Sequence, residues 1–204
     1  MPTPDRDFLR RLDEEQRRRI GDGPASFVDQ DLGGTDLRRL VLQADFERCR
    51  FDDALLLEAD MGGALLGYCS FRGADLSRSW LTKARLHYCD LEGAVLREAH
   101  LAKASIHHSS LRGADLTGAD VARGAFHDCD LRDASLVGLD LQGVAFDACR
   151  LAGADFSGTS GTLSPAPIDV GPEGATRLLE GDAAIRWLLA AGARDIHFLQ
   201  HVRR

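Results

Sequence analysis

Long apolar runs are missing from this sequence. No stretch approaches the ~18 consecutive apolar residues that a membrane-spanning helix needs. The N-terminus from Met1 to Arg19 carries charge throughout and has no apolar core of the kind that a secretory signal peptide requires. We therefore expect no membrane contact and a cytoplasmic location.

Sequence signatures of enzymes and cofactor sites are also missing. The five cysteines include no CxxC pair, which excludes a zinc site of the usual spacing. No GxGxxG segment opens a predicted helix, and no GxxxxGKS or GxxxxGKT segment occurs, so a phosphate-binding loop is not indicated. Because no nucleophile stands beside a general base in a recognisable motif, we predict a protein that is not an enzyme. We expect no catalytic residues, no metal ligands and no cofactor.

An excess of positive charge is lacking as well. Lys and Arg number 25 against 32 Asp and Glu, which leaves a net charge of −7. A basic surface for direct nucleic-acid binding is therefore not expected. A mildly acidic protein could instead suit a partner that normally binds DNA, although most soluble proteins carry this much charge for solubility alone.

A repeat of five residues dominates what is present. From Val41 to Phe156, every fifth residue is a medium or large apolar side chain, at all 24 positions. Two residues before each of these, from Ala44 to Ala154, the residue is Ala, Cys or Ser in 20 of 23 cases. The exceptions are Gly124, Leu139 and Val144. A repeat this regular outranks every local signal for secondary structure.

A period of five fits neither common element. Five residues overshoot one turn of an α-helix, and a plain strand has a period of two. The chain must therefore turn once every five residues and bury the same two positions each time. A longer period of 20 is set by Cys49, Cys69, Cys89, Cys129 and Cys149, with Ser109 in the missing place. Four pentapeptides per coil predict a square solenoid, in which these thiols are small buried residues rather than disulfides or metal ligands.

Individual repeats carry a family resemblance. The segments 74–78, 114–118 and 154–158 match a pattern of Ala, then Asp or Asn, then a large apolar residue. Over about 116 residues the chain resembles the pentapeptide-repeat proteins, and the resemblance implies an all-β solenoid, a right-handed quadrilateral β-helix. The chain contains no Asn, so a ladder at the residue before the central one must use Asp, as at Asp45, Asp60, Asp75, Asp120 and Asp140.

Three regions follow from these patterns. Residues 1–22 are predicted to form an N-terminal helix, residues 23–158 the pentapeptide-repeat β-helix, and residues 159–204 a linker with a C-terminal helical cap or dimerisation segment. The N-terminal helix, with Thr3 as its cap and Pro4 in its first turn, could cover the open end of the solenoid or dock on a partner. Covering is favoured because solenoid ends need protection.

Two places depart from strict regularity. Phe27, Leu32 and Leu37 also step by five, but one residue out of phase. They predict an imperfect first coil, joined to the regular run by a slip near residues 40–42. Near the other end, the bulky Leu139 and Val144 should distort the sixth coil locally.

The C-terminal region is predicted to contain two short helices, over 172–180 and 182–191, with Asp182 as a helix cap. An apolar tail follows. It could cover the final coil or pair with the same tail of a second chain, and the family resemblance implies dimerisation, so we expect a homodimer. The candidate residues for the cap or dimer contact are Phe156, Trp187, Leu188 and Phe198.

One face of the predicted solenoid gathers imidazole and aromatic side chains. Its outward candidates for partner binding are Tyr68, His87, Tyr88, His107, His108 and His127. Three explanations are open. Like side chains on neighbouring rungs could simply stack, which we favour. They could form a partner-binding surface. A metal or catalytic site is least favoured, because an exposed flat wall excludes no water.

A second face is acidic. Its candidate residues are Glu58, Asp75, Glu98, Asp115 and Asp155. The resemblance to the quinolone-resistance branch of the family implies a rod that mimics duplex DNA and modulates DNA gyrase or another type II topoisomerase, conferring antibiotic resistance or self-protection. The alternative is a general protein-interaction scaffold that uses the face rich in His and Tyr.

Overall fold

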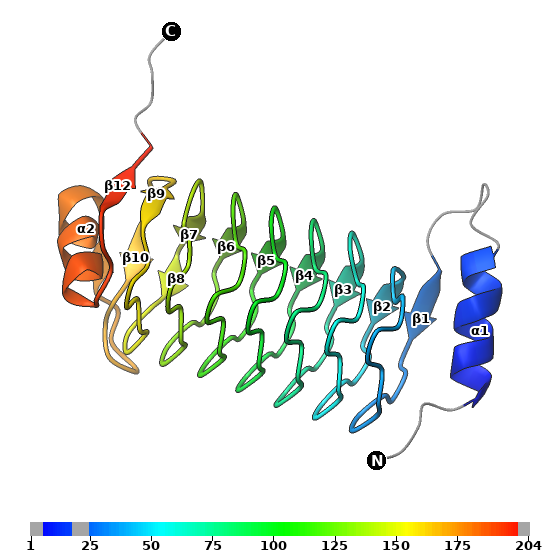
Figure 1. Cartoon of the computed structure of the whole chain (residues 1–204). Helices are drawn as coiled ribbons and strands as arrows, with labels where there is room; N and C mark the ends of the chain where they lie inside the picture. The colour runs from blue at the N-terminus through cyan, green and yellow to red at the C-terminus, as the bar shows by residue number, and fades with distance from the viewer. Residues whose placement is uncertain (1–5, 18–24, 200–204) are drawn as a thin grey trace, which may run out of the picture.

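Seven short parallel strands form one long side of the molecule. The computed structural model describes residues 6–17 and 25–199. Within them, consecutive strands pair in sequence order, and the chain passes through about seven turns of a β-solenoid that runs from helix α1 to helix α2 (Figure 1). The strands of this side are β1 (Ser26–Val28), β2 (Asp45–Glu47), β3 (Leu65–Gly67), β4 (Arg85–His87), β5 (Ser105–His107), β6 (Ala125–His127) and β7 (Ala145–Asp147). The predicted all-β solenoid is confirmed.

The period of 20 is the offset between paired strands. Leu66 pairs with Leu86 and Ile106 pairs with Phe126, so each inward side chain lies on the equivalent residue of the next coil. These side chains are at most 2% exposed, and the small residues two positions earlier are buried with them. The five cysteines lie in that second set, all of them buried and free. The pentapeptide pattern therefore fills the whole interior with two kinds of side chain, one large and one small.

Corners between the faces explain the abundance of Asp. Asp75 Oδ1 accepts a hydrogen bond from the backbone N–H of Ser77 at 3.0 Å, and Asp115 repeats this with Thr117 at 3.0 Å. The carboxylate thus closes a local turn, a role that Asn fills equally well. Asp45 instead accepts from the N–H of Leu65 on the next coil, at 3.1 Å.

The repeat slips after Leu42, one pentapeptide later than the predicted slip between Leu37 and Val41. Val41 is 46% exposed, whereas Leu42 is completely buried. Phe27 pairs with Phe46 at an offset of 19, and the N–H of Ala44 bonds to the carbonyl of Leu42 at 2.7 Å. The first coil is therefore one residue short, and the missing residue falls between Leu42 and Ala44. Starting the regular series at Val41 was wrong, because two adjacent apolar residues fit the pattern equally well.

The coil that contains Leu139 and Val144 keeps its register with its predecessor. Both side chains are buried, and β7 pairs with β6 at the usual offset of 20. The irregularity falls on the following coil instead. Asp140 pairs with Ser160 at an offset of 20, but Val144 pairs with Leu163 at an offset of 19.

Strand pairing continues past the last regular repeat. The short strand β8 (Cys149–Arg150) pairs with β10 (Ile168–Asp169), which also pairs antiparallel with β11 (Leu178–Leu179). The prediction of a first C-terminal helix over residues 172–180 is wrong. Pro172 and Gly174 interrupt it, and the open edge of β10 pairs with the backbone of β11.

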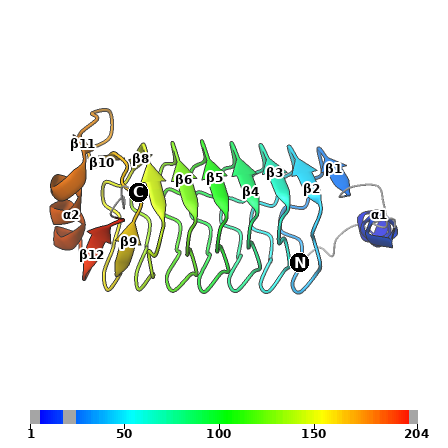
Figure 2. The same cartoon turned by 90° about the horizontal axis from the view of Figure 1, so that it is seen from above.

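The second predicted helix is present as α2 (Gly181–Ala190). It is capped at Glu180 rather than at Asp182, without a side-chain hydrogen bond. After it the chain returns as β12 (Ile196–Phe198), which pairs with β9 (Gly161–Leu163). Figure 2 shows α2, β9 and β12 together at one end of the row of coils.

The other end is covered by α1 (Arg6–Arg17). Phe8 and Leu12 are 2% and 5% exposed, and the ring of Phe8 lies 5.2 Å from that of Phe27 on β1. Thr3, Pro4 and the predicted end of the helix lie outside the described residues. No helix within those residues has the length and apolar character needed to cross a bilayer.

Candidate functional site

The outward side of β1–β7 carries most of the side chains that the repeat does not explain. We call it the sheet face, and we include in it the corner residues that directly follow the strands, Tyr68, Tyr88 and His108. Alternation along each three-residue strand sends the central residue inward and its two neighbours outward, as the exposure of β4 shows. The sheet face is therefore a ladder in which each coil contributes the same outward positions.

The corner residues form a stack. The rings of Tyr68 and Tyr88 lie 5.0 Å apart and 7° from parallel, and those of Tyr88 and His108 lie 4.9 Å apart and 13° from parallel. Tyr68 is nevertheless 59% exposed and Tyr88 is 47% exposed. Stacking thus fixes the orientation of these rings without covering their outer edges.

A second ladder runs along the strands beside it. His87, His107 and His127 are register partners, with ring centroids 5.2 Å and 5.7 Å apart. Asp147 ends this ladder, where its Oδ2 lies 2.8 Å from Nδ1 of His127. The structure therefore brings all six predicted partner-binding residues together on one face.

Burial is the main cause of an electrostatic shift in this ladder. The pKa of His107 is lowered because the ring is partly desolvated and because His87, His127 and His108 oppose a further positive charge. Ser105 Oγ lies 2.5 Å from Nε2 of the same ring. The neutral form of His107 is therefore favoured within this row of imidazoles.

A hollow opens beside the two ladders. Its volume is about 620 Å³, and its floor includes Leu65 and Gly67 of β3. Gly67 on β3 has no side chain and so leaves space between the longer side chains of neighbouring coils. Carboxylates lie toward β2, and a guanidinium and imidazoles lie toward β4 and β5. The lining consists of Ser26, Asp45, Phe46, Glu47, Leu65, Gly67, Tyr68, Arg85, His87, Ser105 and His107.

The hollow was not foreseen from the sequence, although Arg85, Leu65 and Gly67 occupy positions that the period of 20 assigns to this face. The signal in the sequence is Gly67, because the equivalent residues 20 positions before and after it, Glu47 and His87, are much larger. Among the described residues, no group of three or more His, Cys, Asp or Glu side chains is arranged to hold a metal ion.

The predicted acidic residues lie on the face opposite the sheet face, two pentapeptides further along each coil. Two of the five, Glu58 and Asp115, are paired with arginines. Glu58 lies between Arg39 and Arg78, at 2.8 Å and 3.1 Å, and Asp115 lies 2.5 Å from Arg97. The hydrogen bond from Arg39 lowers the pKa of Glu58, so this carboxylate stays ionised and its charge is balanced by the neighbouring arginines.

Asp75 and Asp155 serve a local structural role on this face. Each accepts a hydrogen bond from the backbone N–H two residues later, at 3.0 Å for Asp75 and 2.8 Å for Asp155. Glu98 belongs to the same outward column as Glu58 and Arg78. The face is thus a mixture of charges rather than an acidic strip.

The predicted cap or dimer residues pack within the chain. Phe156 is completely buried, and its ring meets that of Trp187 edge-on at 6.0 Å. Leu188 is 1% exposed, and Phe198 packs partly buried against the same cluster. These residues join α2 and β12 to the last coil.

Comparison with known proteins places the repeat in a family. The model of pentapeptide repeats matches residues 44–82, 79–118 and 126–160, with eight copies, which is more than half of the chain. No curated protein matches the chain at a significant level of similarity.

Three solved structures illustrate what this chain is similar to. HetL, involved in heterocyst differentiation regulation in the cyanobacterium Nostoc sp. strain PCC 7120, is 26% identical; the match covers 69% of this chain and 75% of HetL, with a TM-score of 0.55. QnrB1, a plasmid-mediated fluoroquinolone resistance protein, is 22% identical over 69% of this chain and 78% of QnrB1, with a TM-score of 0.46. Rfr23 from the cyanobacterium Cyanothece 51142 is 20% identical over 75% and 96%, with a TM-score of 0.34. The last two similarities are distant. The chain belongs to the pentapeptide-repeat family.

Proposed function

We propose that this protein is a non-enzymatic binding protein whose working surface is the sheet face. One observation carries the proposal. Aromatic and imidazole side chains stay exposed along this face, beside a hollow of about 620 Å³, and no described part of the chain covers them. Exposed Tyr and His on a rigid scaffold are typical of protein-binding surfaces, because their rings provide contact area at low entropic cost. The recorded involvement of HetL in regulation is compatible with such a role.

Partner capture by a photo-crosslinker tests this proposal. A benzophenone side chain at position 68 in the native host should yield one dominant protein adduct, since Tyr68 is the most exposed ring of the stack. Tyr88→Ala with His107→Ala should remove the adduct and leave the circular dichroism spectrum unchanged.

The matched control is Thr117→Ala with Ser135→Ala. This pair forms a hydrogen-bonded rung of 2.9 Å on the opposite face, and its removal should leave the adduct in place. Equal capture by the Tyr88 and His107 variant would contradict the use of the sheet face.

A narrower hypothesis names the partner as DNA gyrase or another type II topoisomerase, with the rod acting as a mimic of duplex DNA. Its support is the straight stack of coils and the net charge of −7. The arginines beside Glu58 and Asp115 reduce that support, because they neutralise the face that would imitate phosphates. Purified gyrase subunits should then bind the protein, and duplex DNA should displace it. An absence of binding, inhibition and protection at micromolar protein would reject this partner while leaving the sheet-face proposal intact.

We also propose a homodimer through the C-terminal segment. Three apolar side chains stay exposed at that end, Leu178, Leu189 and Leu199, at 57%, 45% and 44%. A molar mass of twice 22.2 kDa by light scattering would support the dimer. Leu189→Glu should then return the mass to that of a monomer, and a monomeric native protein would rule the dimer out.

A further inference from the structure

Unpaired positive charge is concentrated at one corner of the solenoid. Lys83, Lys103 and Arg123 occupy the same position in three successive coils, and we call them the cationic row. All three are exposed, and all three have positive φ, between 57° and 60°. The N–H of Lys83 bonds to the carbonyl of Ala102 at 3.0 Å, and that of Lys103 to the carbonyl of Ala122 at 2.9 Å. Their Cα atoms are therefore separated by about one strand spacing, ~4.8 Å per coil.

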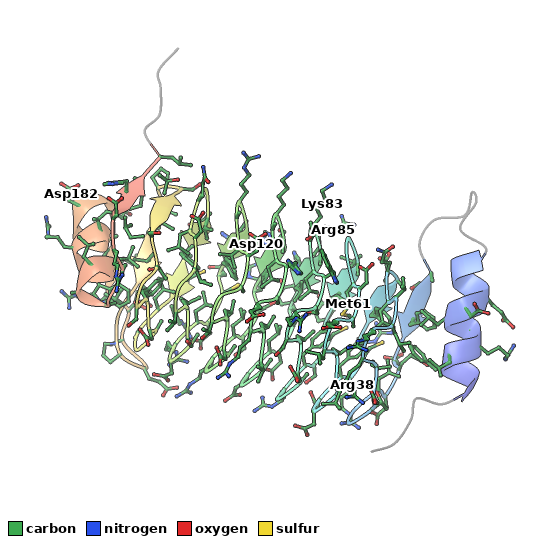
Figure 3. The ribbon with its side chains drawn as sticks, viewed as in Figure 1. Arg38, Met61, Lys83, Arg85, Asp120 and Asp182 are labelled. Carbon is green, nitrogen blue, oxygen red and sulfur yellow. The ribbon has the colours of Figure 1, made fainter. Side chains whose placement is uncertain are left out.

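This row differs from most of the arginines of the described coils, which form ion pairs. Elsewhere, neighbouring coils interleave opposite charges, as Arg39, Glu58 and Arg78 do. Arg72 likewise meets Asp90 and Glu92, at 2.6 Å and 2.7 Å. Among the described residues, no carboxylate forms an ion pair with any member of the cationic row. The same holds for Arg85, which lies on β4 two positions after Lys83. Figure 3 shows Lys83 and Arg85 at the same edge of the coils, away from Arg38.

Packing does not account for this arrangement. Like charges on adjacent rungs of a sheet are destabilising, and nothing of opposite sign separates these three. The nearest acid along the chain, Asp120, directs its Oδ1 to the N–H of Ala122 at 3.1 Å. In a protein of net charge −7, a row of cations without carboxylate partners is suited to bind an anionic ligand.

Arg85, two positions after Lys83, links the cationic row to the hollow of the sheet face, because it is one of the residues that line the hollow. Arg85 supplies the positive charge at one end of the hollow, beside the rings of His87 and His107, whereas Leu65 and Tyr68 give it an apolar middle. Asp45 and Glu47 line the far end, where Glu47 is paired with Arg48 and Asp45 adds a carboxylate. The surface along the rod therefore changes from the cations of the row and Arg85, through an apolar middle, to an end lined by carboxylates.

We propose that the cationic row and the hollow together bind a protein partner through a short acidic segment followed by apolar side chains. The inference rests on the proposed function of the sheet face and adds the chemical class of the partner. The row extends over two coil spacings, about 10 Å. Two or three carboxylates fit that length, since acids two apart on a strand lie ~6.7 Å from one another. A nucleic acid fits less well, because the carboxylates of the neighbouring coils would oppose a longer polyanion.

Fluorescence anisotropy with a defined probe tests the proposal. The probe is a labelled decapeptide, Glu-Glu-Glu-Glu-Gly-Leu-Phe-Gly-Ser-Ser, and a matched peptide carries Gln in place of each Glu. The acidic peptide should bind the full chain and the Gln peptide should not. Binding should weaken several-fold between about 50 and 300 mM NaCl, because salt screens exposed charges.

Two triple variants with the same loss of charge locate the site. Lys83→Gln, Lys103→Gln and Arg123→Gln should weaken binding of the acidic peptide by about tenfold or more. Arg177→Gln, Arg186→Gln and Arg194→Gln remove three exposed arginines of the C-terminal cap and should change the affinity by less than about twofold.

Three results would overturn the inference: no binding of the acidic peptide, an equal loss in both triple variants, or tighter binding of a ten-nucleotide single-stranded DNA than of the peptide. The photo-crosslinking experiment separates this inference from the proposed function. If the Tyr88 and His107 variant loses the partner but the cationic-row variant keeps it, the sheet face is the working surface and the acidic class of partner is wrong.

Discussion

At the scale of single residues, two adjacent apolar side chains can differ completely in burial. Val41 and Leu42 are both apolar neighbours in a region of irregular phase, yet one is 46% exposed and the other is completely buried. The difference arises because the first coil has 19 residues rather than 20, which fixes the phase of everything before Ala44. Burial in a solenoid is thus set by position in the coil and not by hydrophobicity alone.

Alanine substitutions at these two positions should give very different losses of stability. Leu42→Ala should lower the free energy of unfolding by about 2–5 kcal/mol, because it leaves a cavity in a close-packed interior. Val41→Ala should change it by less than about 0.5 kcal/mol. Urea unfolding followed by circular dichroism measures both, and equal losses would mean that the slip lies elsewhere.

His107 makes stability depend on pH. Its pKa in the folded state lies below the ordinary value of 6.5, chiefly because the ring is desolvated. The unfolded chain therefore takes up a proton at a higher pH than the native chain, and the free energy of unfolding falls as the pH drops through about 6.5.

Melting temperatures at about pH 7.5 and pH 5.5 test this effect, in a window above the titration of the carboxylates. His107→Gln should reduce the loss of stability on acidification. His197→Gln, outside the ladder and paired with Asp195, is the control and should leave the loss unchanged. An identical acid response in the His107 variant would show that other groups cause it.

At the scale of elements, the two helices act as covers for the ends of a sheet that has no partner there. The last coil would otherwise expose its apolar layer and its unpaired backbone groups, which favour edge-to-edge aggregation. α2 presents Leu188 to that layer, and β12 pairs with β9 to satisfy the backbone. Leu189, the next residue of the same helix, is 45% exposed.

This pair of leucines provides a matched test of the cap. Leu188→Ala should lower the free energy of unfolding by about 2–5 kcal/mol and promote aggregation, because the cover of the last coil loosens. Leu189→Ala should change the stability of the monomer by less than about 0.5 kcal/mol. Thermal unfolding with light scattering distinguishes the two, and a stable, soluble Leu188 variant would mean that α2 is not needed as a cover.

At the scale of the whole molecule, the solenoid is a one-dimensional stack. Each coil contacts the coils before and after it through the same backbone bonds and the same columns of side chains. The length of the rod is therefore adjustable, whereas the number of residues per coil is not.

Deletion of one complete coil should preserve the fold. Without residues 91–110, Asp90 would connect to Leu111, which occupies the same position one coil later, and every inward column would stay in register. Deletion of residues 91–108 should instead place polar side chains inward and abolish cooperative unfolding. Circular dichroism and urea titration compare the two, and similar behaviour of both deletions would refute a fixed coil of 20 residues.

The sequence by itself determined the solenoid, its period of 20, the buried column of cysteines and the membership of the six Tyr and His residues in one face. These features follow from the repeat, because residues 20 apart occupy equivalent positions in successive coils and so have the same surroundings. Only the tertiary structure decided where the first coil is short, that residues 172–180 do not form a helix, and which charges are paired. These depend on contacts between coils and at the ends, where the chain no longer repeats. The cationic row is visible in the sequence as three Lys and Arg residues, but its lack of carboxylate partners is a property of the folded surface.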